Sequence, residues 1–179
     1  VRRGETVALV GPSGAGKTSF LRAGLLPRLP ATWGAIIATP GHRPFQALAQ
    51  AVAPSIAGDA EAVQQLLRFD DLDSAVAVFR RFRARHTHAL VVLDQFEELF
   101  TLSPPDTQAA LASLLGRFVL EADCHVVLSL RDDFLLRCHA HASLAPAFSD
   151  LTPLGALGES ALRRALVVGG ADVLPGAAC

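Results

Sequence analysis

The chain contains 179 residues, carries a formal net charge of −1 at pH 7 and has a hydrophobic fraction of 51%. A chain of this length is expected to form one domain with a sizeable apolar core. The nearly balanced charge argues against bulk attraction to nucleic acid, so we expect no direct nucleic-acid partner. Apolar runs are strand-sized, far short of the roughly 20 residues that span a membrane, so we expect no membrane segment.

The cysteines favour a reducing compartment. Cys124, Cys138 and Cys179 are odd in number and have no paired spacing, which is typical of a chain without a disulfide framework. No secretory signal precedes the first apolar run, and we expect a cytoplasmic protein. Cys138, His139 and His141 lie close together, but their spacing matches no standard zinc site, so we expect no zinc.

Apolar runs of strand length alternate with segments of helical periodicity along the chain. The predicted strands are residues 6–10, 35–39, 90–94, 125–130 and 151–154. The predicted helices are residues 18–26, 44–52 and 61–69, a helix capped by Asp73 or Ser74 that contains Arg80 to Arg85, and residues 106–122, 132–148 and 158–168. Strands separated by helices predict an α/β fold with a parallel sheet covered on both faces.

The helix with four arginines between positions 80 and 85 has two interpretations. It could form a nucleic-acid patch, or it could be the solvated side of an amphipathic helix whose apolar face carries Val76, Phe79 and Phe82. No aromatic residues interleave with the arginines, as they do on many nucleic-acid surfaces. We therefore favour a solvated face.

Residues 11–18, Gly-Pro-Ser-Gly-Ala-Gly-Lys-Thr, match the phosphate-binding P-loop pattern G-x-x-x-x-G-K-[ST]. A predicted strand precedes this loop and a predicted helix follows it, which is the context that the motif requires. Glycines let the backbone turn its N–H groups toward phosphate oxygens, and the helix N-terminus adds partial positive charge. The expected nucleotide-binding residues are Gly11, Pro12, Ser13, Gly14, Ala15, Gly16, Lys17, Thr18 and Ser19.

Lys17 is the only lysine in the chain, whereas fifteen positions are arginine. This bias indicates that the compact ammonium group is needed here, where it can reach the β- and γ-phosphates. Thr18 is expected to offer its hydroxyl to Mg²⁺.

The run Leu90-Val-Val-Leu-Asp94 is typical of the second nucleotide motif, a buried strand that ends in Asp. Its carboxylate would hold Mg²⁺, usually through water. Glu97 and Glu98 follow closely, and one of them is placed to orient or deprotonate an attacking water. We favour Glu97 slightly over Glu98, and a solvated acidic pair is the competing interpretation.

Arg131 follows the predicted strand at residues 125–130. If that strand lies between the first and third strands, Arg131 faces the γ-phosphate and could stabilise charge there. An ion pair with Asp132 or Asp133 is an equally good interpretation. The nucleotide is expected to be ATP or ADP, because the Asn-Lys-x-Asp guanine motif is excluded in a chain that has no Asn.

Four stretches resemble the STAND class of signal-transducing P-loop NTPases, in particular the novel STAND NTPase 1 group. They are residues 10–29 around the P-loop, 40–49 (Pro-Gly-His-Arg-Pro-Phe-Gln-Ala-Leu-Ala), 93–102 (Leu-Asp-Gln-Phe-Glu-Glu-Leu-Phe-Thr-Leu) and 128–138 (Leu-Ser-Leu-Arg-Asp-Asp-Phe-Leu-Leu-Arg-Cys). The resemblance implies an ATPase that acts as a switch and opens to form homo-oligomers, fused to effector or sensor domains such as WD repeats. It also implies that Pro153 lies near the nucleotide base.

These observations predict a three-layer α/β P-loop NTPase domain of the additional-strand type, with strand order 5-1-4-3-2. The core is expected over residues 1–150, and residues 151–179 would begin a helical region that continues beyond this chain. We expect a module that binds Mg-ATP and hydrolyses it slowly. The alternatives are a small-molecule kinase and a nucleotide-binding scaffold without turnover.

Overall fold

A parallel sheet organises the computed structural model, which describes residues 5–56, 70–144 and 151–153. Its strands are β1 (Thr6–Val10), β2 (Trp33–Ala38), β3 (His88–Leu93), β4 (Cys124–Leu130) and β5 (Leu151–Pro153). They pair in the order β2-β3-β4-β1-β5, which confirms the predicted order 5-1-4-3-2. Strand β4 lies between β1 and β3. This is the strand position that the expected role of Arg131 at the γ-phosphate requires.

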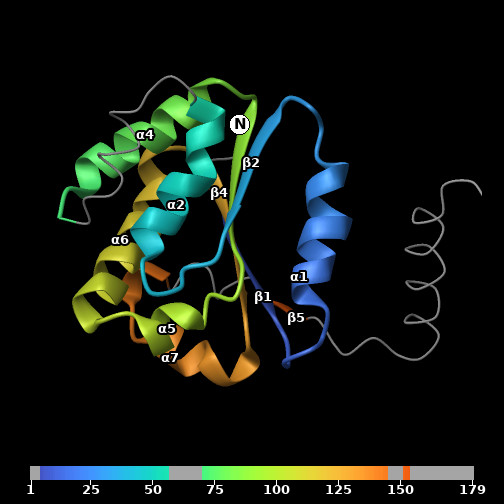
Figure 1. Ribbon diagram of the computed structural model, residues 1–179, viewed down its shortest axis with the longest axis vertical. Helices are drawn as coiled ribbons and strands as arrows, with labels where there is room; N and C mark the ends of the chain where they lie inside the picture. The colour runs from blue at the N-terminus through green and yellow to red at the C-terminus, as the bar shows by residue number, and fades with distance from the viewer. Residues whose placement is uncertain (1–4, 57–69, 145–150, 154–179) are drawn as a thin grey trace, which may run out of the picture.

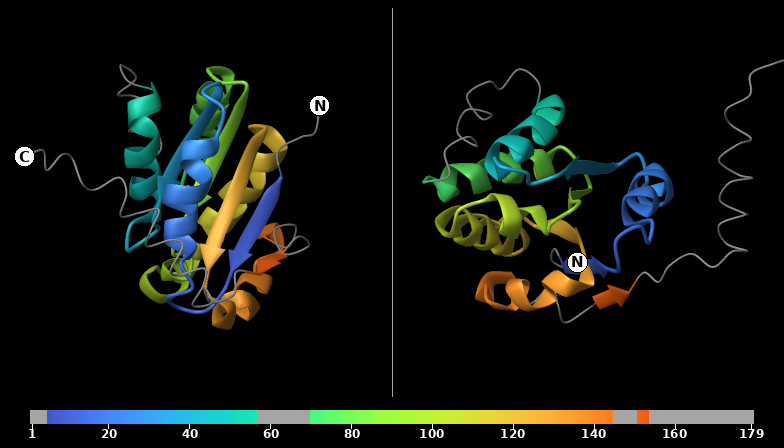
Figure 2. Two further views of the ribbon diagram at one scale, coloured as in Figure 1. Left: turned by 90° about the vertical axis from the view of Figure 1, so that its right-hand side faces the viewer. Right: turned by 60° about the horizontal axis from the view of Figure 1, so that its bottom comes forward.

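Helices cover both faces of the sheet, as Figures 1 and 2 show. One face packs against α2 (Pro44–Val52), α4 (Leu72–Ala84) and α6 (Pro105–Glu121). The other face packs against a single helical run made of α1 (Lys17–Ser19), the π-helix η1 (Phe20–Leu25) and the 3-10 turn η2 (Leu26–Arg28). Successive strand residues point to opposite faces, so β1, β2, β3 and β4 contribute to both apolar cores.

Two short helices, α5 (Glu98–Leu102) and α7 (Leu135–His139), lie at the carboxyl end of the strands. A 3-10 turn, η4 (Asp132–Phe134), connects β4 to α7. The predicted helix over 132–148 is not continuous, because α7 ends at His139. Residues 145–148 of that prediction lie outside the described residues. A further 3-10 turn, η3 (Ala53–Ile56), follows α2.

Several element boundaries differ from the predictions. Strand β2 begins at Trp33 rather than at residue 35, because Trp33 pairs with His88 and stacks on its ring at a centroid distance of 4.6 Å. Helix α4 is capped by Asp71 rather than Asp73, since Asp71 Oδ1 accepts from the Ser74 backbone N at 3.0 Å. The predicted helices 61–69 and 158–168 lie outside the described residues.

The arginine-bearing side of α4 is tied to the end of α6. Arg80 pairs with Glu121 at 3.2 Å, and Arg83 pairs with Asp123 at 2.9 Å. Below them, the rings of Phe79 and Phe118 pack with centroids 3.9 Å apart. Two of the four arginines therefore help to join α4 to the end of α6 rather than forming a free basic patch. Among the described residues, no helix is both long and apolar enough to cross a membrane.

Gly34 and Gly24 provide a matched pair of glycine substitutions. A Cβ at Gly34 would lie 2.2 Å from His86 Cδ2, whereas a Cβ at Gly24 would meet its nearest atom at 3.4 Å. We expect Gly34→Ala to destabilise the fold by about 1–3 kcal/mol, because the imidazole ring must move. Gly24→Ala in the helical run should stabilise it by about 0.5–1 kcal/mol.

Chemical unfolding of both variants measures these changes. The double variant Gly34→Ala/His86→Ala should lose less stability from the glycine change than the single variant does. A Gly34→Ala protein as stable as the parent would contradict the close packing of β2 against His86.

Candidate nucleotide site

The P-loop between β1 and α1 adopts a backbone that requires glycine. Gly14 and Gly16 have φ values of 78° and 86°, in the left-handed region that residues with a Cβ rarely adopt. Gly16 is also the N-cap of α1, and its carbonyl accepts from Phe20 N at 2.8 Å. At the start of the loop, Gly11 N donates to Leu130 O at 3.4 Å and so joins the loop to β4.

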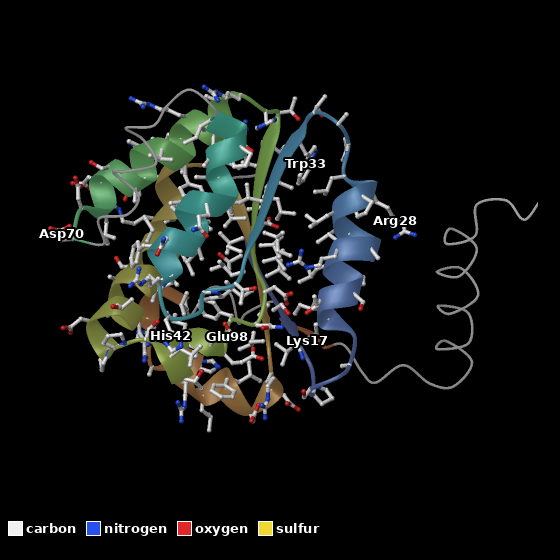
Figure 3. All side chains as sticks on the ribbon, in the orientation of Figure 1. Lys17, Arg28, Trp33, His42, Asp70 and Glu98 are labelled. Atoms are coloured by element: carbon white, nitrogen blue, oxygen red, sulfur yellow. The ribbon has the colours of Figure 1, made fainter. Side chains whose placement is uncertain are left out.

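Lys17 reaches back across its own loop. Its Nζ donates to Gly11 O at 2.6 Å and to Pro12 O at 2.9 Å. Figure 3 places Lys17 at the carboxyl end of the sheet, the end at which Glu98 also lies, and places Trp33 toward the opposite end. The ammonium group is thus held in the loop by neutral carbonyls.

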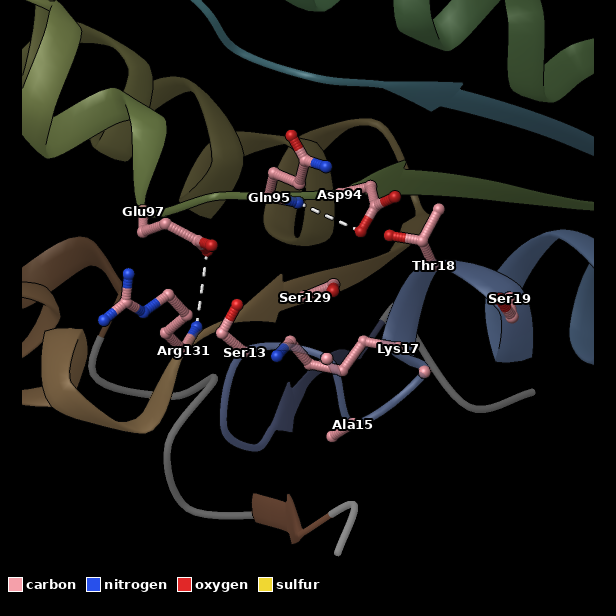
Figure 4. A pocket seen from close by; sticks show the side chains of 12 residues that line it. Ser13, Ala15, Lys17, Thr18, Ser19, Asp94, Gln95, Glu97, Ser129 and Arg131 are labelled. Carbon is pink, nitrogen blue, oxygen red and sulfur yellow. Dashed lines mark hydrogen bonds between the residues drawn. The ribbon is translucent and has the colours of Figure 1, made fainter. Parts of the chain in front are cut away.

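A pocket of about 330 Å³ lies between the P-loop and the carboxyl ends of β3 and β4 (Figure 4). One wall is made by Ser13, Gly14, Ala15, Gly16, Lys17, Thr18 and Ser19, and the other by Asp94, Gln95, Glu97, Ser129 and Arg131. The structure therefore brings together most of the site residues predicted from the sequence. Gly11, Pro12 and Glu98 are not among the lining residues, although Gly11 and Pro12 hold Lys17 through their carbonyls.

Asp94 is 1% exposed and directly follows β3. Its Oδ1 accepts from the Gln95 backbone N at 3.0 Å, and Figure 4 shows its carboxylate turned toward the Thr18 hydroxyl. A carboxylate and a hydroxyl that face each other in the wall of this pocket are the hard oxygen donors that suit Mg²⁺. The residues present therefore fit a magnesium ion with its phosphate ligands.

The two glutamates are placed differently. Glu97 lines the pocket, and its Oε2 accepts from the Arg131 backbone N at 3.3 Å. Glu98 begins α5, and its carboxylate lies next to Gly41. A Cβ added at Gly41 would be 3.9 Å from Glu98 Oε2. The turn of the chain after Phe96, which is fully buried, thus directs only the first carboxylate into the pocket.

Arg131 combines features of both interpretations offered by the sequence. Its backbone lies beside the pocket, and its guanidinium forms a two-point ion pair with Asp133, from Nε to Oδ1 at 3.0 Å and from a terminal nitrogen to Oδ2 at 2.7 Å. The same guanidinium lies 5.6 Å from the centre of the Phe134 ring. Arg131 would have to leave Asp133 to neutralise charge in the pocket.

Sequence reasoning missed two pocket residues, Gln95 and Ser129. Gln95 follows Asp94 and has a φ of 54°, which is uncommon for a residue other than glycine. Ser129 is fully buried next to the end of β4. The alternation of side chains along β4 could have located Ser129, because it shares a face with Val127 and not with Leu128.

The described cysteines take no part in this pocket. Burial raises the pKa values of Cys124 and Cys138 to about 12, so both thiols stay protonated at neutral pH. A protonated thiol is a poor nucleophile and a poor metal ligand. The chemistry of the site therefore rests on its oxygen and ammonium groups.

Three comparisons place this geometry among known proteins. Over residues 1–173 the chain matches the family described as Novel STAND NTPase 1. A curated relative, the zinc import ATP-binding protein ZnuC of Ruegeria pomeroyi, is 54% identical over 43 residues, which are 24% of this chain and 16% of that protein.

Two solved structures share the fold. The Walker-type ATPase of Pyrococcus abyssi has a TM-score of 0.66 and 14% sequence identity, over 95% of this chain and 55% of its own. The ORC1 protein of Aeropyrum pernix, in complex with DNA, has a TM-score of 0.56 and 19% identity, over 98% of this chain and 46% of its own. The chain thus spans about half of these structures and a sixth of the curated relative. Because the family match covers nearly its whole length, the chain belongs to the Novel STAND NTPase 1 family of P-loop NTPases.

Proposed function

We propose that this chain binds ATP together with Mg²⁺ and hydrolyses it slowly, as the regulatory switch of a larger signalling or defence protein. The observation that carries the proposal is the pocket in which Lys17 and Thr18 face Asp94 and Glu97. Family membership and the ATP-binding relative support a nucleotide as the ligand.

In this proposal the P-loop N–H groups and Lys17 bind the phosphates of ATP. Lys17 exchanges its neutral carbonyl partners, Gly11 O and Pro12 O, for anionic phosphate oxygens, which accept stronger hydrogen bonds. Thr18 and Asp94 would hold Mg²⁺, whose charge offsets that of the phosphates.

We assign the general base to Glu97. Its carboxylate lines the pocket, whereas that of Glu98 does not, so Glu97 can orient an attacking water and accept its proton. Turnover is expected to be slow because Arg131, the one arginine among the described lining residues, is paired with Asp133. An arginine supplied by a neighbouring molecule can raise such a rate by about 10³–10⁵-fold.

The proposal also covers the longer protein of which this chain would be one part. We infer that nucleotide state controls the conformation and homo-oligomerisation of a longer cytoplasmic protein, with fused effector or sensor domains such as WD repeats and no direct nucleic-acid partner. Residues 1–150 would be the NTPase core, and residues 151–179 would begin the next region. Pro153, at the end of β5 next to β1, would approach the nucleotide base.

Lys17→Ala should weaken Mg-ATP binding by about ten- to hundredfold, because it removes a charge-assisted hydrogen bond to phosphate. Arg28→Ala is the control, since Arg28 lies at the far end of the same helical run (Figure 3). Calorimetric titrations with ATP, ADP and GTP measure both variants. Equal affinity of the Lys17→Ala variant and the parent for Mg-ATP would contradict the site assignment.

Glu97→Gln should lower ATP turnover by about 10²–10⁴-fold, because an amide cannot accept the proton of the attacking water. Affinity for Mg-ATP should stay within a few-fold of the parent. Glu98→Gln is the matched control and should keep near-parental turnover. A steady-state phosphate-release assay compares them, and loss of turnover in Glu98→Gln with retention in Glu97→Gln would reverse the assignment.

A further inference from the structure

A stack of three aromatic rings lies at the amino end of the sheet. Trp33 on β2 stacks on His88 of β3 at a centroid distance of 4.6 Å and on His125 of β4 at 5.6 Å. The two imidazoles lie 5.8 Å apart. Figure 3 places Trp33 toward the end of the sheet opposite Lys17, so this ring stack is separate from the candidate nucleotide site.

His125 also holds the residue that precedes β1. Its Nδ1 accepts from the Glu5 backbone N at 3.3 Å, and the Glu5 carbonyl accepts from Val126 N at 2.8 Å. Both backbone polar groups of Glu5 are therefore bonded to β4. The pairing of β1 with β4 begins at the next residue, where Thr6 lies opposite Val126. The bond to His125 thus fixes the start of the strand that leads to the P-loop.

This bond requires the neutral form of the His125 ring. A neutral imidazole has one donor and one acceptor nitrogen, whereas a protonated imidazole has two donors and no acceptor. Protonation would place an N–H of His125 against the N–H of Glu5, and the Glu5 donor would lose its acceptor. Because histidine changes charge near neutral pH, a contact of this kind responds to modest acidification.

The surroundings of His125 favour the neutral ring in the folded protein. Burial lowers the pKa of His125, and the neighbouring His88 lowers it further. Glu5 and Asp123 act in the opposite direction, but Asp123 pairs with Arg83 at 2.9 Å, and Arg83 itself lowers the pKa of His125. The helical run packs leucine side chains onto this face of the sheet. The folded protein therefore resists a proton that the unfolded chain accepts.

We propose that protonation of His125 opens the contact between Glu5 and β4 and so makes the start of β1 sensitive to pH. Above about pH 6.5, the ordinary pKa of histidine, the neutral ring holds Glu5 and adds stability. As the pH falls below this value, the unfolded chain gains a proton and this stability is lost. Strand β1 leads from this contact to Gly11, so acidification loosens the strand that carries the P-loop. The inference does not depend on nucleotide binding.

The test is His125→Asn in the full 179-residue chain. The Asn amide oxygen stands near the place of Nδ1 and can accept from Glu5 N, but it does not titrate. Thermal unfolding at pH 7.5 and at pH 5.5 compares this variant with the parent. We expect the parent to lose about 2–5 °C more than His125→Asn between these pH values. His42→Asn, at an exposed histidine between β2 and α2, is the matched control and should lose as much as the parent.

Hydrogen exchange in the parent chain gives a local readout that needs no variant. Exchange rates corrected for their intrinsic dependence on pH report how often each amide opens. From pH 7.5 to pH 5.5, we expect the protection of the amides of residues 6–8 to fall about three- to tenfold relative to that of residues 90–92 in β3. The His125→Asn variant should remove this difference.

Three results would overturn the proposal. One is an equal loss of melting temperature in the parent and His125→Asn, since the proton would then act elsewhere. Another is an equal loss of protection in residues 6–8 and 90–92, because β1 would then not open by itself. The third is a His42→Asn variant that resists acid as well as His125→Asn does. None of these results bears on whether the chain binds ATP, so the proposed function is tested separately.

Discussion

The pairing of β1 with β4, and of β4 with β3, is the constraint on which the rest of the structure depends. Parallel strands bring their carboxyl ends to one edge, and the two pairings bring the P-loop after β1 next to the residues that follow β3 and end β4. Lys17 and Asp94 are far apart in the sequence but line one pocket for this reason. A one-residue slip between β4 and β3 would turn Ser129 away from Asp94, because successive side chains alternate between the two faces.

Charged groups in this pocket are mostly satisfied by the protein itself. Lys17 is bonded to backbone carbonyls, Glu97 to the Arg131 backbone N, and the Arg131 side chain to Asp133. Each of these bonds competes with a ligand for the same group, so nucleotide binding must exchange partners instead of filling unpaired sites. Such exchange lowers the net gain from each contact.

The fold could be predicted well because the patterns that indicate it each lie within one short stretch of sequence. The P-loop requires a strand before it and a helix after it, and apolar runs bounded by Gly, Pro or Asp marked the strands. Of the two boundary errors, one depends on a tertiary contact and the other on a local helix cap. Trp33 joins β2 because it stacks on His88, and Asp71 replaces Asp73 as a cap because its carboxylate reaches Ser74. Neither contact leaves a periodic signal. Ser129 was missed although the alternation of side chains along β4 places it on the same face as Val127.

We propose that the pocket between the P-loop and the ends of β3 and β4 binds ATP with Mg²⁺. The most direct measurement is the melting temperature of the parent chain as a function of nucleotide concentration, since a ligand that binds only the folded state raises it progressively. We expect a concentration-dependent rise with ATP and Mg²⁺, a smaller rise when EDTA removes the metal, and little change with GTP. A melting temperature unaffected by ATP and Mg²⁺ at millimolar concentration, or raised equally with and without the metal, would contradict it.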